Sequence, residues 1–251
     1  MSKKTTLILE SKKIQRLVKS RTVLDVRHLK FHKGTIYGVV GAVGSGKSSL
    51  LSILSGHSKP DKGTVLYDYN PYNKNIFGKV YPPSDMLFVN NYNFKNTIVS
   101  KLFNKSNGSQ ILANYFSNSS IDGVLNTKLD HLTNGEKNAV MLSLGIELDP
   151  RVLVVDDYAM HFDNKMENKF RKKLKNINKD HGTTILLSSA NEQLLKAFCS
   201  VLIYLDNGHI SKIRTGSQKA GSYDRNRGRG YQKNTSRRPK PRYKRKNDNP
   251  R

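Results

Sequence analysis

The stretch that organises this sequence is glycine-rich and reads Val40-Gly41-Ala42-Val43-Gly44-Ser45-Gly46-Lys47-Ser48. It spells the pattern G-x-x-x-x-G-K-S and lies between an apolar run at residues 35–40 and another at residues 50–54. This context predicts a strand, a tight loop and a helix in succession. Glycines allow backbone N–H groups to turn inward around a phosphate, which the positive end of the following helix also attracts. The stretch therefore predicts a loop that binds the phosphates of a nucleoside triphosphate.

Two side chains of this loop have separate expected roles. Lys47 is expected to reach the β- and γ-phosphates as a catalytic group, and the Ser48 hydroxyl is expected to ligate Mg²⁺. The alternative interpretation is a glycine-rich turn that binds nothing. The expected nucleotide-binding residues of this region are Gly41, Ala42, Val43, Gly44, Ser45, Gly46, Lys47, Ser48 and Ser49.

The composition limits the class of protein. A chain of 251 residues, 36% of them hydrophobic, can form one large domain or two small ones. No segment approaches the about 18 uninterrupted apolar residues of a membrane-spanning helix, and the short apolar run near the N-terminus does not resemble a signal peptide. The single cysteine, Cys199, is incompatible with an internal disulfide framework and is typical of a reducing compartment. We expect it to be a small buried apolar residue rather than a catalytic thiol.

The formal net charge of +25 is concentrated near the C-terminus. Residues 214–251 contain 14 Lys or Arg against two Asp, with Arg-Gly repeats, three tyrosines and almost no aliphatic side chains. Such a segment cannot bury enough apolar area to offset its chain entropy, so we expect a disordered tail after a globular body at residues 1–213. Its composition suits contact with RNA or with anionic lipid and does not separate the two.

Strand and helix patterns alternate along the body. Helices are expected at residues 135–148, with Thr133 and Asn134 as candidate caps, and near residues 192–197. Strands are expected at residues 5–9, 23–31, 35–40, 64–67, 86–89, 152–155, 184–187 and 201–205. Several of these strands are apolar without alternation, which predicts a mostly parallel sheet covered by helices on both faces.

A second motif follows the apolar strand at residues 152–155, where Asp156 and Asp157 come next. A carboxylate at the end of a buried strand beside a phosphate loop can hold Mg²⁺ through water. Asp156 is therefore a candidate metal ligand. Without the phosphate loop, a turn-initiating Asp would be an equal interpretation.

Together these motifs resemble the ATP-binding subunits of ABC transporters over almost the whole body. The segment at residues 132–136, Leu-Thr-Asn-Gly-Glu, takes the place of the family's L-S-G-G-Q signature, and Asp163 matches the Asp of its D-loop. The resemblance implies an ABC-type P-loop fold, a small helical subdomain at about residues 92–148 and ATP held between two domains arranged head to tail. Thr133, Asn134 and Gly135 would then contact the ATP bound to a second ATP-binding subunit.

The sequence also departs from this family at positions that cleave ATP. Asp157 stands where a catalytic Glu is usual, and Ala190 stands where the switch His is usual. The family's coupling glutamine is replaced by Asn90 or Asn91, of which Asn91 is assigned to the metal site beside Ser48 and Asp156. No aromatic residue for the adenine is found at residues 18–21. We therefore expect an ATPase with Asp157 as its base and with impaired hydrolysis, either slow or dependent on a partner.

Within the family, short strings near residues 194–203 and 207–209 look most like the ATPases of capsular polysaccharide exporters. That resemblance implies a peripheral subunit on the cytoplasmic face of the membrane, docked on an integral membrane permease, with Tyr92 and Phe94 as candidate contacts. Ordinary packing of the helical subdomain is the alternative for these two aromatics. The alternative function is a soluble ABC-type ATPase bound to RNA or ribosomes through the basic tail.

Overall fold

The computed structural model describes residues 6–76, 78–89, 96–103, 107–116 and 118–216. All of them belong to one compact unit at residues 1–218, and a second unit at residues 219–251 lies outside the described part. The tail prediction therefore falls almost entirely outside the described residues. Arg214 and Thr215, which were assigned to the tail, form the end of a strand instead.

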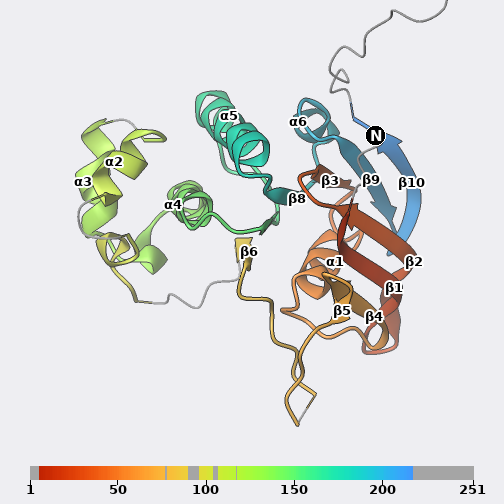
Figure 1. Ribbon diagram of the computed structural model, residues 1–251. Helices are drawn as coiled ribbons and strands as arrows, with labels where there is room; N and C mark the ends of the chain where they lie inside the picture. Colours follow the sequence, from red (N-terminus) through yellow and green to blue (C-terminus); the bar gives the residue numbers. More distant parts are fainter. Residues whose placement is uncertain (1–5, 77, 90–95, 104–106, 117, 217–251) are drawn as a thin grey trace, which may run out of the picture. The chain divides into compact units, whose positions relative to one another are not determined.

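The larger of two sheets has six strands in the order β10-β9-β3-β8-β7-β6 (Figure 1). The strands from β9 to β6 pair in parallel, and only β10 is antiparallel to its neighbour. Their bounds are Ile36–Val40 (β3), Met86–Val89 (β6), Val152–Val155 (β7), Thr184–Ser189 (β8), Val201–Asp206 (β9) and His209–Thr215 (β10). The mostly parallel sheet predicted from unalternated apolar runs is confirmed, and β3, β7 and β8 are buried along their whole length.

Adjacent residues of the central strands pack into two different cores. Leu153 and Val155 of β7 belong to one core, which also contains side chains of the helices at residues 134–147 and 164–180. Val152 and Val154 belong to the other core, which contains side chains of the helix at residues 47–54. Because neighbouring residues of a strand point to opposite faces, apolar layers cover both faces of the sheet. The helices are Lys47–Leu54 (α1), Gly108–Ala113 (α2), Asn118–Asn126 (α3), Asn134–Glu147 (α4), Asn164–Asp180 (α5) and Glu192–Lys196 (α6), with short 3₁₀ turns at Val99–Lys101 and Leu129–His131.

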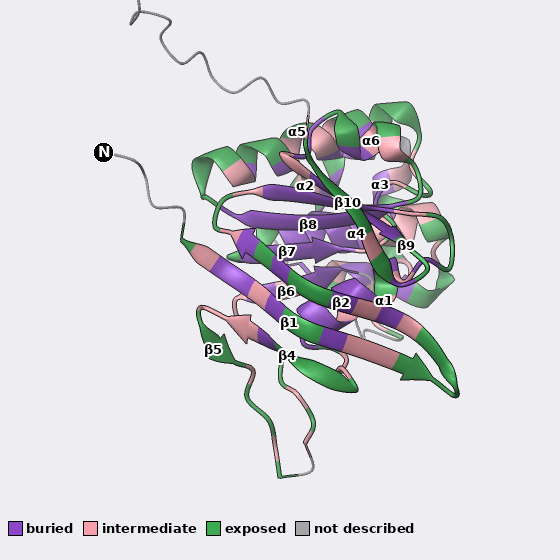
Figure 2. Cartoon of the chain, turned by 90° about the vertical axis from the view of Figure 1, so that its right-hand side faces the viewer, coloured by how far each residue is buried: buried purple, intermediate pink, exposed green. Residues whose placement is uncertain are grey.

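The second sheet is antiparallel and has the order β2-β1-β4-β5 (Figure 2). Its strands are Leu7–Val18 (β1), Arg21–His32 (β2), Lys62–Tyr67 (β4) and Asn70–Pro71 (β5). A separate antiparallel sheet was not predicted, and the strand expected at residues 5–9 continues to Val18. Charged and amide side chains interrupt the apolar pattern of β1 after Leu9, and none of them is buried, while Ile14 is fully buried.

Candidate nucleotide-binding site

The glycine-rich loop joins the end of β3 to the start of α1, as its sequence predicts. Gly46 has a φ of +102° and precedes the first residue of the helix. A Cβ atom on Gly41 would lie 2.3 Å from the carbonyl oxygen of Leu205 and 2.5 Å from Ser45 Oγ. The loop conformation therefore depends on the absence of side chains at both positions, because one needs left-handed backbone and the other has no free space.

Lys47 extends its ammonium group back over this loop. Its Nζ donates to the carbonyl oxygens of Gly41 at 2.9 Å and Ala42 at 2.8 Å, and the residue is only 6% exposed. Ser45 Oγ is also buried, and it has no hydrogen-bond partner among the described residues. A buried ammonium and an unsatisfied hydroxyl in one loop at a helix start fit an anionic group such as a phosphate.

A pocket of about 390 Å³ leads away from the start of α1. Ser48 and Asp156, the two expected metal ligands, both line it, together with Ser49 of α1. Arg16 and the half-exposed Val18 of β1 and the aromatic Phe88 of β6 line it as well. Expected Mg²⁺ ligands from distant segments thus meet in one cavity.

Ser188 at the end of β8 orients the two acidic residues that follow β7. Its hydroxyl donates to Asp156 Oδ1 and accepts the backbone N–H of Asp157 at 2.9 Å. No role in the site was predicted for Ser188 from the sequence. The available signal was a hydroxyl at the end of a strand that neighbours the Asp-bearing strand in a parallel sheet, because the carboxyl ends of such strands share one edge.

Ser188→Ala is expected to raise the Mg²⁺ concentration needed for ATP binding by about tenfold, because an outer hydrogen bond that fixes a ligand carboxylate is removed. ATP titrations at a series of Mg²⁺ concentrations measure the effect. Ser189→Ala is the matched control, since its hydroxyl accepts only the nearby N–H of Asn191 in the described structure. An equal Mg²⁺ requirement in both variants would contradict the role given to Ser188.

Asp157 has an unusual backbone and an unusual acidity. Its φ is +47°, a left-handed conformation that Asp tolerates better than most residues. Burial raises the pKa of its carboxyl above the ordinary value, and the neighbouring Asp156 carboxylate adds to the rise. Lys47 and His161 act in the opposite direction, so both lie within electrostatic range of Asp157. A carboxylate of raised basicity beside the phosphate loop suits the task of a general base.

His161 was not singled out in the sequence. It lies in the turn after β7, and Ala190, the position of the missing switch His, is exposed just beyond the end of β8. The carbonyl oxygen of His161 lies 3.1 Å from the place of a Cβ on Gly135, so the turn packs closely on the start of α4. An imidazole therefore occurs near Asp157, although it comes from a different segment than expected.

The segment at residues 133–135 begins α4, as predicted, and Thr133 is its N-cap. The Thr133 hydroxyl accepts the N–H of Glu136 at 3.3 Å and donates to the Glu136 carboxylate at 2.7 Å. That carboxylate in turn accepts the N–H of Thr133 at 2.9 Å, which completes a capping box. The hydroxyl expected to contact a phosphate is thus used within its own helix cap.

The expected nucleotide-binding residues fall into two places within the chain. The phosphate loop and α1 lead to the 390 Å³ pocket, whereas Gly135 lines a different cavity of about 470 Å³ with His161 and Asp163. Asn90, Asn91, Tyr92 and Phe94 lie outside the described residues, so their predicted roles stay predictions. No helix among the described residues has the length and apolarity to span a bilayer.

Comparison with known proteins agrees with this geometry. A family model described as ABC transporter matches residues 24–159. The spermidine/putrescine import ATP-binding protein PotA of Mycoplasma capricolum is 25% identical over 216 residues, which cover 83% of this chain and 61% of that protein. This chain therefore spans about three fifths of that relative's length. The tungstate uptake system ATP-binding protein TupC of Peptoclostridium acidaminophilum is 25% identical over 76% of this chain and 91% of its own length.

A third relative is the energy-coupling factor transporter ATP-binding protein EcfA1 of Mesomycoplasma hyopneumoniae, 26% identical over 76% of this chain and 74% of that protein. Among solved structures, the dimeric bacterial ABC transporter cassette MJ0796 superposes with a TM-score of 0.70 at 18% identity, covering 83% of this chain and 98% of that one. This structural likeness supports the fold.

Proposed function

The chain belongs to the ABC transporter family as an ATP-binding domain, and from this we propose that it is the energy-coupling subunit of a membrane transporter. The observation that carries the proposal is the phosphate loop with the Lys47 ammonium buried against it. Ser48 and Asp156 line the pocket that continues from this loop and would hold Mg²⁺. When bound, the metal would polarise the terminal phosphates of ATP.

We propose that the ATP-binding site is completed by a second ATP-binding subunit, either a copy of this chain or a related one. Gly135 and the phosphate loop line separate cavities within one chain, so a head-to-tail partner would be needed to bring them to one nucleotide. Thr133 would then have to exchange its bond to Glu136 for a phosphate, whereas Asn134 and Gly135 present the helix start itself.

We propose that hydrolysis is slow or dependent on a partner. The Asp157 side chain is one methylene shorter than the Glu usual in the family, and Ala190 carries no proton-transfer group. His161 lies near Asp157 and would hold that carboxylate in its charged form, since it lowers a pKa that burial raises. The residues that bind phosphate are thus better retained than those that cleave it.

His161→Ala is expected to lower kcat for ATP hydrolysis about tenfold, because the group that favours the ionised Asp157 is lost. The pH profile should also move, with the acidic limb displaced to higher pH in the variant. His181→Ala is the control, since that exposed imidazole pairs with Asp149. Equal rates and pH profiles in the two variants would contradict a role for His161, and Ala190→His in the His161→Ala background should restore part of the rate.

For the cargo class, we propose import or energy-coupling factor transport. The named relatives are import or energy-coupling factor subunits, and they give no support to the polysaccharide export suggested by the short sequence strings. We propose that the chain lies on the cytoplasmic face of the membrane against a permease, a partner that Tyr92 and Phe94 would contact.

Fractionation of nuclease-treated cells tests this function. We expect the full-length chain to sediment with membranes and to co-purify with a polytopic membrane protein after detergent extraction. Nuclease-sensitive sedimentation with ribosomes would contradict the transporter proposal and would favour a soluble ATPase that acts on RNA.

A further inference from the structure

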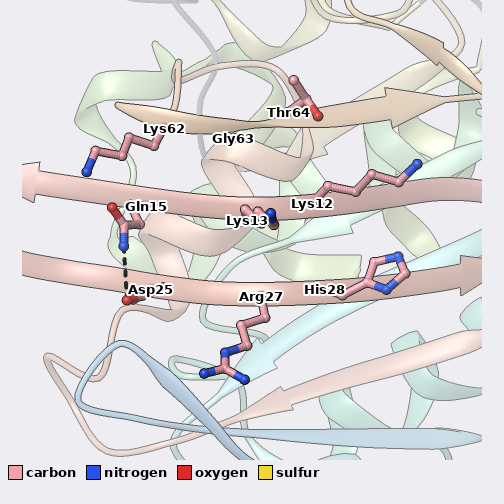
Figure 3. Close-up of a pocket in the computed structure, with 9 residues that line it drawn as sticks. All are labelled: Lys12, Lys13, Gln15, Asp25, Arg27, His28, Lys62, Gly63 and Thr64. Atoms are coloured by element: carbon pink, nitrogen blue, oxygen red, sulfur yellow. Dashed lines mark hydrogen bonds between the residues drawn. The ribbon is translucent and has the colours of Figure 1, made fainter.

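The outer face of the antiparallel sheet has a hollow of about 1080 Å³ that is separate from the nucleotide site. Figure 3 shows that β1, β2 and β4 all contribute side chains to it. Its basic members are Lys12, Lys13, Arg27, His28 and Lys62. It shares no lining residue with the pocket that contains Ser48 and Asp156.

The floor of the hollow follows from an irregularity in β1. Lys13 has a φ of +51°, and the pairing of β1 with β4 shifts register between Lys12 and Gln15. A Cβ atom on Gly63 of β4 would lie only 2.2 Å from the carbonyl oxygen of Lys13. Glycine is therefore required opposite the bulge, because the backbone of β1 approaches too closely for any side chain.

The same irregularity gathers positive charge. Lys12 and Lys13 are two consecutive exposed residues of β1, and Arg27 and His28 are two consecutive exposed residues of β2. Lys12 pairs in register with His28, and the next paired residues are Ile14 and Val26, so all four basic side chains lie at one level of the sheet. Like charges close together on neighbouring strands destabilise a sheet, so Lys13 of β1 and Arg27 of β2 favour a bound anion.

Nearby acidic groups compensate only part of this charge. Glu10 pairs with His28 at 2.7 Å and with Lys12 at 3.2 Å. Asp25 accepts a hydrogen bond from Gln15 at 3.1 Å. Among the described residues, Lys13, Arg27 and Lys62 form no ion pair and no side-chain hydrogen bond, and Figure 3 shows one of them on each of three adjacent strands.

We propose that this hollow binds a small metabolite that carries several phosphate groups. Ammonium and guanidinium groups from three strands provide separate donors for separate phosphates, and guanidinium matches the geometry of phosphate oxygens. The volume is close to that of small-molecule pockets, which reach about 1,000 Å³. Among the residues that the structure describes, no Phe, Tyr or Trp lines the hollow, so they provide no stacking platform for a single-stranded nucleic acid.

The test uses the full-length chain and myo-inositol hexakisphosphate as a compact polyphosphate probe, measured by calorimetry. All proteins carry Lys47→Ala, so that the phosphate loop does not contribute. Lys13→Gln/Arg27→Gln/Lys62→Gln removes the uncompensated charges. Lys172→Gln/Lys175→Gln/Lys179→Gln removes the same number of charges from exposed positions of α5 and is the matched control.

We expect the sheet variant to bind the probe at least about tenfold more weakly, because charge-assisted hydrogen bonds are lost, whereas the α5 variant stays within about twofold. Equal affinity in the two variants would overturn the proposal, since binding would then follow overall charge. Tighter, Lys13- and Arg27-dependent binding of a short single-stranded RNA or of anionic lipid vesicles would also overturn it. If the triple variant melts early, Arg27→Gln/Lys62→Gln against Lys175→Gln/Lys179→Gln gives the same comparison.

Discussion

Lys47→Ala is expected to weaken ATP·Mg binding by about 100-fold or more, because a charge-assisted contact to the phosphates is worth over tenfold on its own and the loop also loses its shape. The Nζ atom of Lys47 holds the carbonyl oxygens of Gly41 and Ala42. Without this ammonium group, the two carbonyl oxygens would face the phosphate of bound ATP directly, and their partial negative charges would repel it. Calorimetric titration of the purified chain with ATP and Mg²⁺ measures the loss.

Two further variants show whether ATP binding depends on the charge of Lys47, on its size or on the net charge of the chain. Lys47→Arg keeps the charge but not the size, and it should fail to restore binding because the site of this side chain is almost closed to solvent. Lys179→Ala, at an exposed position near the end of α5, should leave ATP affinity within about twofold of the unchanged chain. Full ATP affinity in a folded Lys47→Ala protein would remove the basis of the proposed function.

The parallel sheet and the phosphate loop could be read from the sequence because their signals are local. β6 and β7 were predicted to the residue, since a continuous apolar run has clear ends. Of the two predicted candidate caps before α4, Thr133 is the N-cap and Asn134 is the first helical residue. The antiparallel sheet was missed. In β1, the polar residues that follow Leu9 hide a strand whose buried positions are few and irregularly spaced around the bulge at Lys13.

The residues of the candidate site that were not predicted from the sequence were missed for a different reason. Ser188 lies more than thirty residues after Asp156, and only the pairing of β7 with β8 brings its hydroxyl to that carboxylate. Likewise, the proximity of His161 to Asp157 depends on two left-handed residues, Asp157 and Ala159, within one turn. Such conformations are set by packing rather than by a sequence motif, so a search for an imidazole after β8 found only Ala190.

The nucleotide pocket and the basic hollow also differ in how far the sequence could reveal them. The nucleotide pocket is predicted by a motif with fixed spacing. The basic hollow lies at a register shift between β1 and β4, and it brings Lys62 and Lys13 to one surface although 49 residues separate them in the chain. In the sequence these lysines are indistinguishable from ordinary solvated residues, and only the sheet shows that their charges are uncompensated.

Asp157→Asn is expected to lower kcat for ATP hydrolysis by about 100-fold or more while ATP affinity stays within about threefold, because an amide cannot accept the proton of the attacking water. Asn retains the size of the side chain and tolerates the left-handed backbone at this position, so the loop should keep its conformation. Steady-state hydrolysis and calorimetric ATP binding on the same preparation separate the two effects.

The Asp157→Asn variant should also show whether two subunits assemble around ATP. If ATP lies between two subunits, Asp157→Asn should form a dimer that is stable in ATP and Mg²⁺ and falls apart in ADP, as measured by light scattering during gel filtration. Asp157→Glu extends the carboxylate by one methylene, and it should raise kcat about tenfold if a misplaced base limits the rate. Unchanged hydrolysis in Asp157→Asn would show that another group activates the water, and His161 would then be the first to test, since its imidazole influences the pKa of Asp157.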